Sequence, residues 1–202
     1  MIDLPRFYPI VDRAEWVGRL VPLGVNLIQL RIKGRPEHEV RREVRQAKAI
    51  CTRFRAQLVV NDYWRIALQE ECYFVHLGQE DLAGADLRAL RRTGTRIGIS
   101  THDPAELETA LSADPDYVAL GPIYPTKLKQ MPWAPHGIER IAEWKQLIGP
   151  KPLVAIGGLT IERARLCLAA GADSVAVVSD IVAAEDPMAQ ARAWLKATEL
   201  VR

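Results

Sequence analysis

Two short stretches decide how this chain folds: Val59-Val60-Asn61-Asp62 and, further along, His76-Leu77-Gly78-Gln79-Glu80-Asp81. Each contains apolar residues typical of a buried strand and then changes abruptly to acids and amides. Parallel strands that are buried on both faces have this continuous apolar character. Carboxylates directly after such strands are costly unless something binds them. The two stretches therefore predict strands whose ends share a cation, and such a cation commonly carries a phosphorylated ligand.

Other apolar runs accompany these two, and segments with helical spacing separate them. Asp103-Pro104 has the residue types that open a helix, with Asp at the cap and Pro at the first helical position. Strand then helix, eight times in 202 residues, predicts an α/β protein: a single (β/α)8 TIM barrel over residues 1–202. An open doubly wound sheet is the alternative, but it rarely has eight strands in so short a chain. The expected strands are 7–11, 26–31, 57–62, 74–79, 96–101, 117–121, 152–158 and 174–179.

Charge and composition exclude several classes of protein. The chain has 27 basic and 25 acidic residues, a net charge of +2, which gives no reason to expect nucleic acid or a membrane as partner. No apolar run approaches the ~18 residues of a membrane span. Cys51, Cys72 and Cys167 are odd in number and widely spaced, so we interpret them as packing residues in a reducing, cytoplasmic compartment. A homo-oligomer stays open, since nothing in the sequence sets the oligomeric state.

Polar and apolar residues alternate along the second expected strand. Gln29, Arg31 and Lys33 alternate with Leu30 and Ile32, and at period two the polar set shares one face, which is expected to point at the barrel axis. Two cations there cost on the order of several kcal/mol unless they are paired. Either the carboxylates after the third and fourth strands pair with them, or they bind a phosphate or pyrophosphate together with a metal ion. We favour the anionic ligand.

The last strands predict a second anion site. Gly157-Gly158 ends the seventh strand before a helix, and Ser179 ends the eighth; loops at these positions form the phosphate cup of many barrels. The long loop Pro125–Gly137 is a candidate substrate lid at the same face. His76 and His102 are interpreted as hydrogen-bonded structural residues, and no nucleophile–base constellation or zinc motif is present. Cations, hydroxyls and carboxylates without a strong base favour departure of a pyrophosphate.

Taken together, these motifs resemble one family, thiamine phosphate synthase (thiamine-phosphate pyrophosphorylase). They occur in the family's order from about residue 8 to residue 181, and the Asn-Asp and Gly-Gln-Glu-Asp elements are the most specific. The segments that resemble it are Gln29–Lys33, Asn61-Asp62, His76–Leu82, Ser100–His102, Gly121–Thr126, Ala155–Gly158 and Ala176–Ser179.

The resemblance implies an enzyme, a transferase of thiamine biosynthesis, acting on small-molecule substrates. A thiazole phosphate, plain or carboxylated, displaces the pyrophosphate of 4-amino-2-methyl-5-hydroxymethylpyrimidine, with one Mg²⁺ per subunit, giving thiamine phosphate. By analogy the metal ligands are Asp62 and Asp81, and the catalytic residues are Arg31, Lys33, Ser100 and Lys129. The pyrimidine-pyrophosphate contacts are Gln29, Leu30, Arg31, Ile32, Lys33, Asn61, Ser100 and Lys129. The thiazole-phosphate contacts are Thr126, Lys127, Leu128, Gly157, Gly158, Val178 and Ser179.

The chain departs from the family pattern at two positions. Leu128 stands where the family has a threonine, so one phosphate contact is lost or replaced. Asp180 follows Ser179 where the family tends to have a small residue, and a carboxylate beside a phosphate cup is unfavourable unless it turns outward or pairs with a cation. Two alternatives are a thiazole tautomerase-like barrel, which would lack the acids after the third and fourth strands, and a non-catalytic phosphate-ligand-binding barrel.

Overall fold

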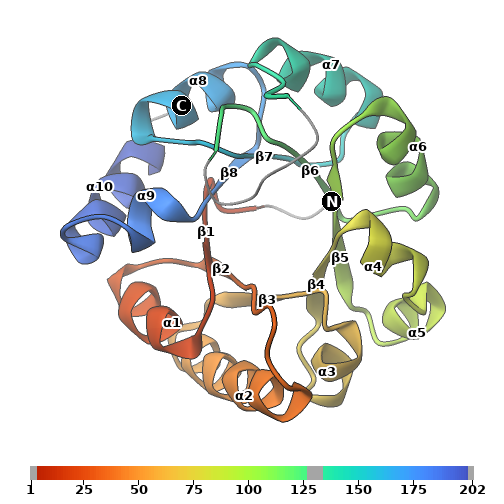
Figure 1. Ribbon diagram of the computed structural model, residues 1–202, viewed down its shortest axis with the longest axis vertical. Helices are drawn as coiled ribbons and strands as arrows, with labels where there is room; N and C mark the ends of the chain where they lie inside the picture. Colours follow the sequence, from red (N-terminus) through yellow and green to blue (C-terminus); the bar gives the residue numbers. More distant parts are fainter. Residues whose placement is uncertain (1–3, 127–133, 200–202) are drawn as a thin grey trace.

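The computed structural model describes residues 4–126 and 134–199, in which eight parallel strands close into a barrel in sequence order, β1 to β8. Figure 1 shows helices surrounding the strands, so the predicted (β/α)8 barrel is confirmed. The strands are β1 (Phe7–Val11), β2 (Leu27–Leu30), β3 (Gln57–Asn61), β4 (Phe74–Leu77), β5 (Arg96–Thr101), β6 (Tyr117–Leu120), β7 (Leu153–Ile156) and β8 (Ser174–Val177).

Most strands are followed by a helix that returns the chain to the start of the next strand. Within the described ranges the helices are α1 (Ala14–Leu20), the 3₁₀ helix η1 (Val21–Leu23), α2 (Glu37–Phe54), α3 (Trp64–Gln69), α4 (Gln79–Ala83), α5 (Leu87–Arg92), α6 (Pro104–Ser112), α7 (Glu139–Ile148), α8 (Ile161–Ala169), α9 (Ser179–Val182) and α10 (Pro187–Glu199). The predicted start of α6 is confirmed, because Asp103 caps it by accepting a hydrogen bond from the backbone of Glu106. In the described chain, no helix is both long and apolar enough for a membrane crossing.

Six of the eight expected strands end too late, and those expected at 74–79, 152–158 and 174–179 do so by two residues. β2 ends at Leu30, so the segment from Arg31 to Lys33 follows the strand instead of belonging to it. β4 ends at Leu77 and β8 at Val177, and short helices begin at Gln79 and Ser179. Helices of four or five residues leave no periodic trace in a sequence, so their first polar residues looked like strand ends. The predicted strand face therefore holds for Gln29, which lies in β2 and is buried, and is wrong for Arg31 and Lys33, which follow β2 and are exposed.

The barrel interior is filled by its own small cluster, separate from the larger core between strands and helices. Leu27, Val59, Phe74 and Tyr117 belong to this inner cluster and are buried. Gly98 of β5 pairs with Tyr117 of β6, and a Cβ on Gly98 would lie 2.1 Å from the Tyr117 ring. The missing side chain therefore makes the slot in which the Tyr117 phenol lies across the barrel.

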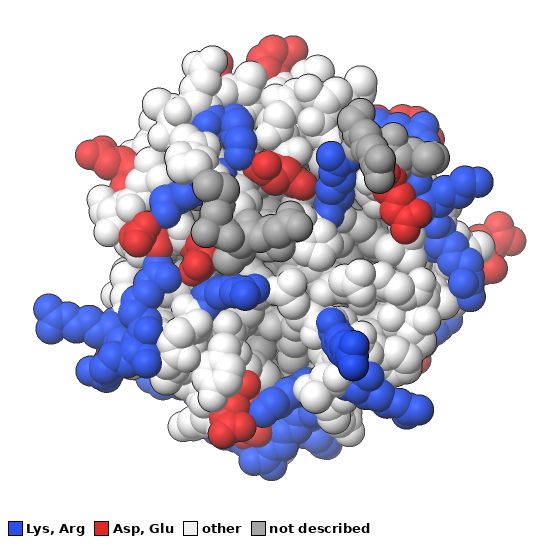
Figure 2. Space-filling model, turned by 180° about the vertical axis from the view of Figure 1, so that it is seen from behind, with Lys and Arg blue, Asp and Glu red and all other residues white. Residues whose placement is uncertain are grey.

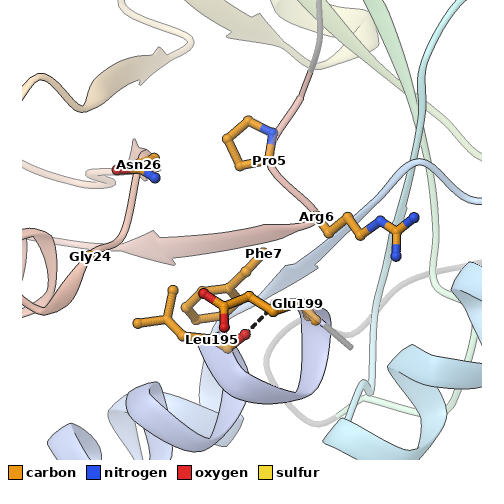
Figure 3. Close-up of a pocket in the computed structure, with 8 residues that line it drawn as sticks. Pro5, Arg6, Phe7, Gly24, Asn26, Leu195 and Glu199 are labelled. Carbon is orange, nitrogen blue, oxygen red and sulfur yellow. Dashed lines mark hydrogen bonds between the residues drawn. The ribbon is translucent and has the colours of Figure 1, made fainter. Parts of the chain in front are cut away.

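A hollow of about 350 Å³ lies at the amino-terminal end of the barrel, beside α10 (Figure 3). Pro5 and Arg6 precede β1, Asn26 precedes β2, and Glu199 ends α10, so these residues lie opposite the carboxyl ends of the strands. Barrel enzymes place their chemistry at the carboxyl ends. On the face seen in Figure 2, basic and acidic side chains are interspersed around the rim, in line with the nearly balanced net charge.

Candidate active site

The acids and amides after the strands meet at one mouth of the barrel. Asn61 is the last residue of β3, Asp62 follows it, and Asp81 lies in α4 directly after β4. Ser100 is near the carboxyl end of β5, and pairing of β3 with β4 places Asn61 beside His76. Because all eight strands are parallel in one closed barrel, their carboxyl ends share this mouth. The structure thus brings together residues that are far apart in the sequence.

The carboxyl groups of Asp62 and Asp81 form a pair. Asp62 has a left-handed backbone with φ of 63°, a conformation that Asp tolerates better than most residues, and its N–H donates to the His76 carbonyl at 2.9 Å. The Asp81 carboxyl is within hydrogen-bonding reach of Asp62. Burial, together with the neighbouring Asp62, raises the pKa of Asp81 from 3.8 to about 6. Burial and the neighbouring carboxylate both disfavour the charged form of Asp81, and a bound cation would favour it.

Lys33 supplies one positive charge to this pair. Its Nζ contacts Oδ2 of Asp62, and 53% of the Lys33 side chain is exposed against 10% of the Asp62 side chain. Arg31 is exposed and forms no ion pair with a described residue. The sequence left open whether the acids pair with the cations or the cations bind an anion. Direct pairing is present for Lys33 and leaves Arg31 available to an anionic ligand.

The carboxylate oxygens suit a hard divalent cation. Among the residues of the described ranges, no three His, Cys, Asp or Glu side chains gather into a complete metal site, so the protein would contribute the carboxylates of Asp62 and Asp81. Mg²⁺ is usually bound by one or two carboxylates, with water and substrate phosphates completing its coordination. The donor set, with the Lys33 ammonium group against one of its members, fits such an ion.

A chain of hydrogen bonds crosses the barrel interior and ends at this mouth. Gln29 Nε2 donates to the Tyr8 hydroxyl at 2.9 Å, and the Tyr8 and Tyr117 hydroxyls are 3.0 Å apart. The Tyr117 hydroxyl lies 2.7 Å from His76 Nδ1, and His76 Nε2 lies 2.7 Å from Ser100 Oγ. Burial lowers the pKa of His76 from 6.5 to about 4, so the imidazole is neutral at pH 7. The prediction that His76 is a hydrogen-bonded barrel residue is confirmed.

Sequence reasoning missed three residues that organise the mouth. Tyr8 and Tyr117 looked like ordinary members of apolar strands; the signal that could have found them is the hydroxyl, because a buried tyrosine hydroxyl needs a partner. Gln79 donates from Nε2 to the Ser100 carbonyl at 2.7 Å, which ties the end of β5 to α4. His102 has the structural role expected of it, with Nδ1 2.7 Å from a Glu106 carboxylate oxygen.

The two glycines after β7 fit tightly against the loop that follows β6. Gly157 and Gly158 both have positive φ, 103° and 64°. A Cβ on Gly157 would lie 2.6 Å from Pro122, and one on Gly158 would lie 2.4 Å from the Pro125 carbonyl oxygen. From the sequence, we interpreted these glycines as allowing the backbone to approach an anion. The structure adds a second reason, because the neighbouring loop leaves no room for any side chain.

Arg163 of α8 holds this glycine turn in place. Its Nη1 donates to the Gly158 carbonyl at 2.6 Å, and its guanidinium lies 4.6 Å from the centre of the Tyr124 ring. One side chain therefore connects the turn after β7 with the loop after β6, where Thr126 is the last described residue before the gap. The positions predicted to contact a thiazole phosphate at Lys127 and Leu128, and the predicted catalytic Lys129, lie outside the described residues.

Asp180 turns away from the expected phosphate cup. Its Oδ2 accepts hydrogen bonds from Gln190 Nε2 and from Trp194 Nε1, both at 2.7 Å. Both donors belong to α10, so the carboxylate joins α9 to that helix. This resolves the departure noted at Asp180, since its carboxylate is paired with two donors of α10.

Comparison with known proteins gives a consistent result. A family model described as thiamine monophosphate synthase matches residues 7–181. The thiamine-phosphate synthase of Rhizobium etli is 63% identical over 195 residues, covering 96% of each chain, and that of Citrobacter koseri is 48% identical over 191 residues, covering 95% of this chain and 87% of the relative.

Similarity in structure agrees with similarity in sequence. The thiamine phosphate pyrophosphorylase of Pyrococcus furiosus superposes with a TM-score of 0.84 at 27% identity, over 98% of this chain and 96% of that one. The family match, residues 7–181, spans the eight strands, the acidic pair, the glycine turn and the start of α9. On this evidence the chain belongs to the thiamine monophosphate synthase family.

Proposed function

We propose that this barrel joins 4-amino-2-methyl-5-(diphosphooxymethyl)pyrimidine to 4-methyl-5-(2-phosphoethyl)thiazole, or to its carboxylated precursor. The thiazole ring nitrogen forms a bond to the methylene carbon of the pyrimidine. The carbon–oxygen bond to pyrophosphate breaks, and its electron pair leaves with the pyrophosphate. The observation that carries the proposal is the convergence of exposed cations and paired carboxylates at the mouth of a barrel that belongs to this family.

The cations near β2 would take the leaving group. Arg31 and Lys33 are exposed beside the acidic pair, and Lys129 is proposed to join them. Leu30 and Ile32 are buried, so they would offer the pyrophosphate backbone groups only. Fixed positive charge aimed at a departing anion lowers the barrier most when it acts in the transition state. Departure of pyrophosphate then leaves a positive charge that the electron-rich aminopyrimidine spreads over its ring, as in a dissociative displacement.

Asp62 and Asp81 are proposed to hold one Mg²⁺ per subunit. When bound, the ion would neutralise negative charge on the pyrophosphate oxygens. Asp81 would bind the ion in its ionised form, and Lys33 would be freed from Asp62 to contact the anion. The raised pKa of Asp81 and the contact between Lys33 and Asp62 support this exchange of partners.

The glycine turn and the start of α9 are proposed to hold the thiazole phosphate. Gly157, Gly158, Val178 and Ser179 would contribute backbone N–H groups and a hydroxyl, with Thr126 on the facing loop. Binding the phosphate there orients the thiazole nitrogen toward the methylene carbon, which replaces a bimolecular encounter by a positioned one. His76 and His102 are engaged in hydrogen bonds, and the reaction as written needs no base.

Compartment and assembly remain predictions. Three buried, unpaired cysteines are compatible with a reducing cytoplasm, and a homo-oligomer is compatible with a barrel whose mouth is formed by one chain. Size-exclusion chromatography coupled to light scattering would give the number of subunits.

The experiment that tests the proposal is a turnover assay with both substrates, with and without Mg²⁺, following release of pyrophosphate. Asp62→Ala is expected to lower turnover by at least about 100-fold at saturating Mg²⁺, because pyrophosphate would leave without its cation. Asp114→Ala is the matched control: Asp114 also has positive φ, 52°, and pairs with a lysine, Lys151, but its carboxylate is exposed and remote from the mouth.

Two outcomes would overturn the proposal. Binding of both ligands without pyrophosphate release would indicate the non-catalytic barrel. Conversion of the thiazole precursor in the absence of the pyrimidine, unaffected by Asp62→Ala, would indicate the tautomerase-like alternative.

A further inference from the structure

The buried hydrogen-bond chain joins the two residues to which the proposed function assigns the pyrimidine. Gln29 and Ser100 lie on β2 and β5, and three residues, Tyr8, Tyr117 and His76, connect them from β1, β6 and β4. Each of the four links is between 2.7 and 3.0 Å long. The chain therefore spans the full width of the barrel directly below the mouth.

Burying these polar side chains in a barrel core costs desolvation free energy, and the neighbouring residues leave room for them. Tyr117 is 0% exposed and Tyr8 is 1% exposed, whereas neighbours in the inner cluster such as Leu27 and Val154 are apolar. Apolar side chains would fill this space without the desolvation cost of polar groups. Gly98 gives up its side chain to admit the Tyr117 phenol. Packing alone therefore does not account for this series of buried hydrogen bonds.

The number of protons available sets the direction of donation along this series of hydrogen bonds. Each tyrosine hydroxyl has one proton to donate, and a neutral imidazole has one N–H. If the Gln29 amide donates to Tyr8, then Tyr8 donates to Tyr117, Tyr117 donates to Nδ1 of His76, and Nε2–H of His76 donates to Ser100. Ser100 then keeps its own proton for a ligand. If every link is reversed, the Gln29 amide is turned so that its oxygen accepts from Tyr8, and Ser100 donates its proton to His76 and presents only lone pairs.

The mouth favours the first direction. In that direction Gln29 presents its amide oxygen, since Nε2 is used on Tyr8. Of the fully buried side-chain polar atoms in the described chain, only His136 Nε2 lacks a partner. The amide oxygen of Gln29, which no described hydrogen bond uses, is therefore not fully buried. Arg31 and Lys33 follow on the same segment, and positive charge favours an amide oxygen over an amide N–H as neighbour.

We propose that Tyr8, Tyr117 and His76 are positioning residues that make Gln29 present an acceptor and Ser100 a donor to the substrate ring. An aminopyrimidine offers the complement, an exocyclic amine that donates beside ring nitrogens that accept. The inference rests on the proposed function, which supplies the pyrimidine. It adds that the pattern of donors and acceptors at the mouth is fixed by three residues that do not touch the substrate.

The direction of the chain can be read without any substrate. Nitrogen chemical shifts of labelled imidazole distinguish Nε2–H from Nδ1–H, and His76→Gln identifies the His76 signals among the four histidines. The wild-type protein is expected to carry the proton on Nε2, and Tyr117→Phe is expected to lose that single tautomer. A proton on Nδ1 in the wild type would overturn the proposed direction, whether or not the protein has the proposed activity.

Kinetics test the consequence for the substrate. Tyr117→Phe removes the central hydroxyl and keeps the ring, so the KM for the pyrimidine pyrophosphate should rise about tenfold while the KM for the thiazole phosphate stays within about twofold. Tyr8→Phe breaks the chain nearer Gln29 and serves as the second variant if Tyr117→Phe does not fold. Tyr73→Phe, which removes an exposed hydroxyl, is the matched control. Unchanged pyrimidine KM in a folded Tyr117→Phe or Tyr8→Phe variant would overturn the proposal; an inactive wild type would instead contradict the proposed function.

Discussion

The mouth of the barrel has a charged half and a backbone half. After β2, β3 and β4 it carries charged side chains: Lys33 contacts Asp62, and Asp81 lies beside Asp62. After β7 it offers the turn of Gly157 and Gly158, packed so closely against the loop after β6 that no side chain fits. Charge tolerates small displacements because it acts over distance, whereas a backbone turn binds only in one shape. The two halves should therefore fail in different ways.

The largest effect on use of the thiazole phosphate is expected in the backbone half. Gly158→Ala would place a Cβ 2.4 Å from the Pro125 carbonyl oxygen at a φ of 64°, so the turn must shift. We expect kcat/KM for the thiazole phosphate to fall by about 100-fold and the free energy of unfolding to fall by about 1–3 kcal/mol. Steady-state kinetics and thermal unfolding measure both. Gly94→Ala is the control, since Gly94 has a φ of 71° with nothing within 4 Å; equal losses in both variants would mean that the contact is irrelevant.

The charged half should respond to pH instead. The pKa of Asp81 is raised from 3.8 to about 6, first by burial and then by Asp62, so the metal-free protein keeps this proton until about pH 6. Mg²⁺ must displace it, and the apparent affinity for Mg²⁺ should fall about tenfold for each pH unit below 6 and level off above it. Calorimetry of Mg²⁺ binding at several pH values, with Asp81→Asn as control, tests this. An affinity that is flat from pH 5 to pH 7 would contradict it.

The raised pKa of Asp81 also affects the free energy of unfolding. A salt-bridged acid stabilises the fold more as the pH rises, whereas Asp81 does so less. Between pH 3.8 and about 6 the folded protein holds the Asp81 proton more tightly than the unfolded chain does. The contribution of Asp81 to the free energy of unfolding is therefore greatest at low pH and is lost as the pH rises through about 6. Added Mg²⁺ should restore stability above pH 6 and have little effect below it.

Much of this comparison could be predicted from the sequence, because it depends on residues that directly follow the strands. Asp62 and Asp81 follow apolar runs directly, and parallel strands bring such ends together, so the charged half needed no knowledge of distant contacts. The glycine pair was found for the same reason. The steric contact of Gly158 with Pro125 could not be found, because it depends on how two loops cross. Tyr8 and Tyr117 were missed because a tyrosine in an apolar strand shows its hydroxyl partner only after the barrel has closed.

Loss of the Arg163 side chain, which contacts the glycine turn, should have a smaller effect than a change of the glycines themselves. Arg163→Met removes the hydrogen bond to the Gly158 carbonyl and the contact with Tyr124 while keeping the aliphatic packing. We expect the KM for the thiazole phosphate to rise about threefold to tenfold, with a stability loss of about 1 kcal/mol. Arg165→Met changes an exposed residue of the same helix and should leave both unchanged. A rise in the KM for the pyrimidine alone would show that Arg163 belongs to the other half.

The smallest effect on activity is expected at Asp180. Its carboxylate is engaged by Gln190 and Trp194, so Asp180→Ala should cost about 1–2 kcal/mol of stability through the lost bonds and leave both KM values within about twofold. Chemical denaturation and steady-state kinetics make the comparison. A marked gain in affinity for the thiazole phosphate would mean that the carboxylate repels the phosphate after all.

The aromatic filling of the barrel has a consequence for the order of events. The Tyr117 ring lies 5.8 Å from that of Phe74 and 6.1 Å from that of Tyr8, so the interior is closed beneath the mouth and every molecule must pass through one entrance. In the proposed arrangement the pyrimidine contacts Gln29, which is 2% exposed, and the thiazole phosphate contacts the glycine turn and Ser179, which is exposed. Since both substrates use this one entrance, we expect the pyrimidine to bind before the thiazole phosphate.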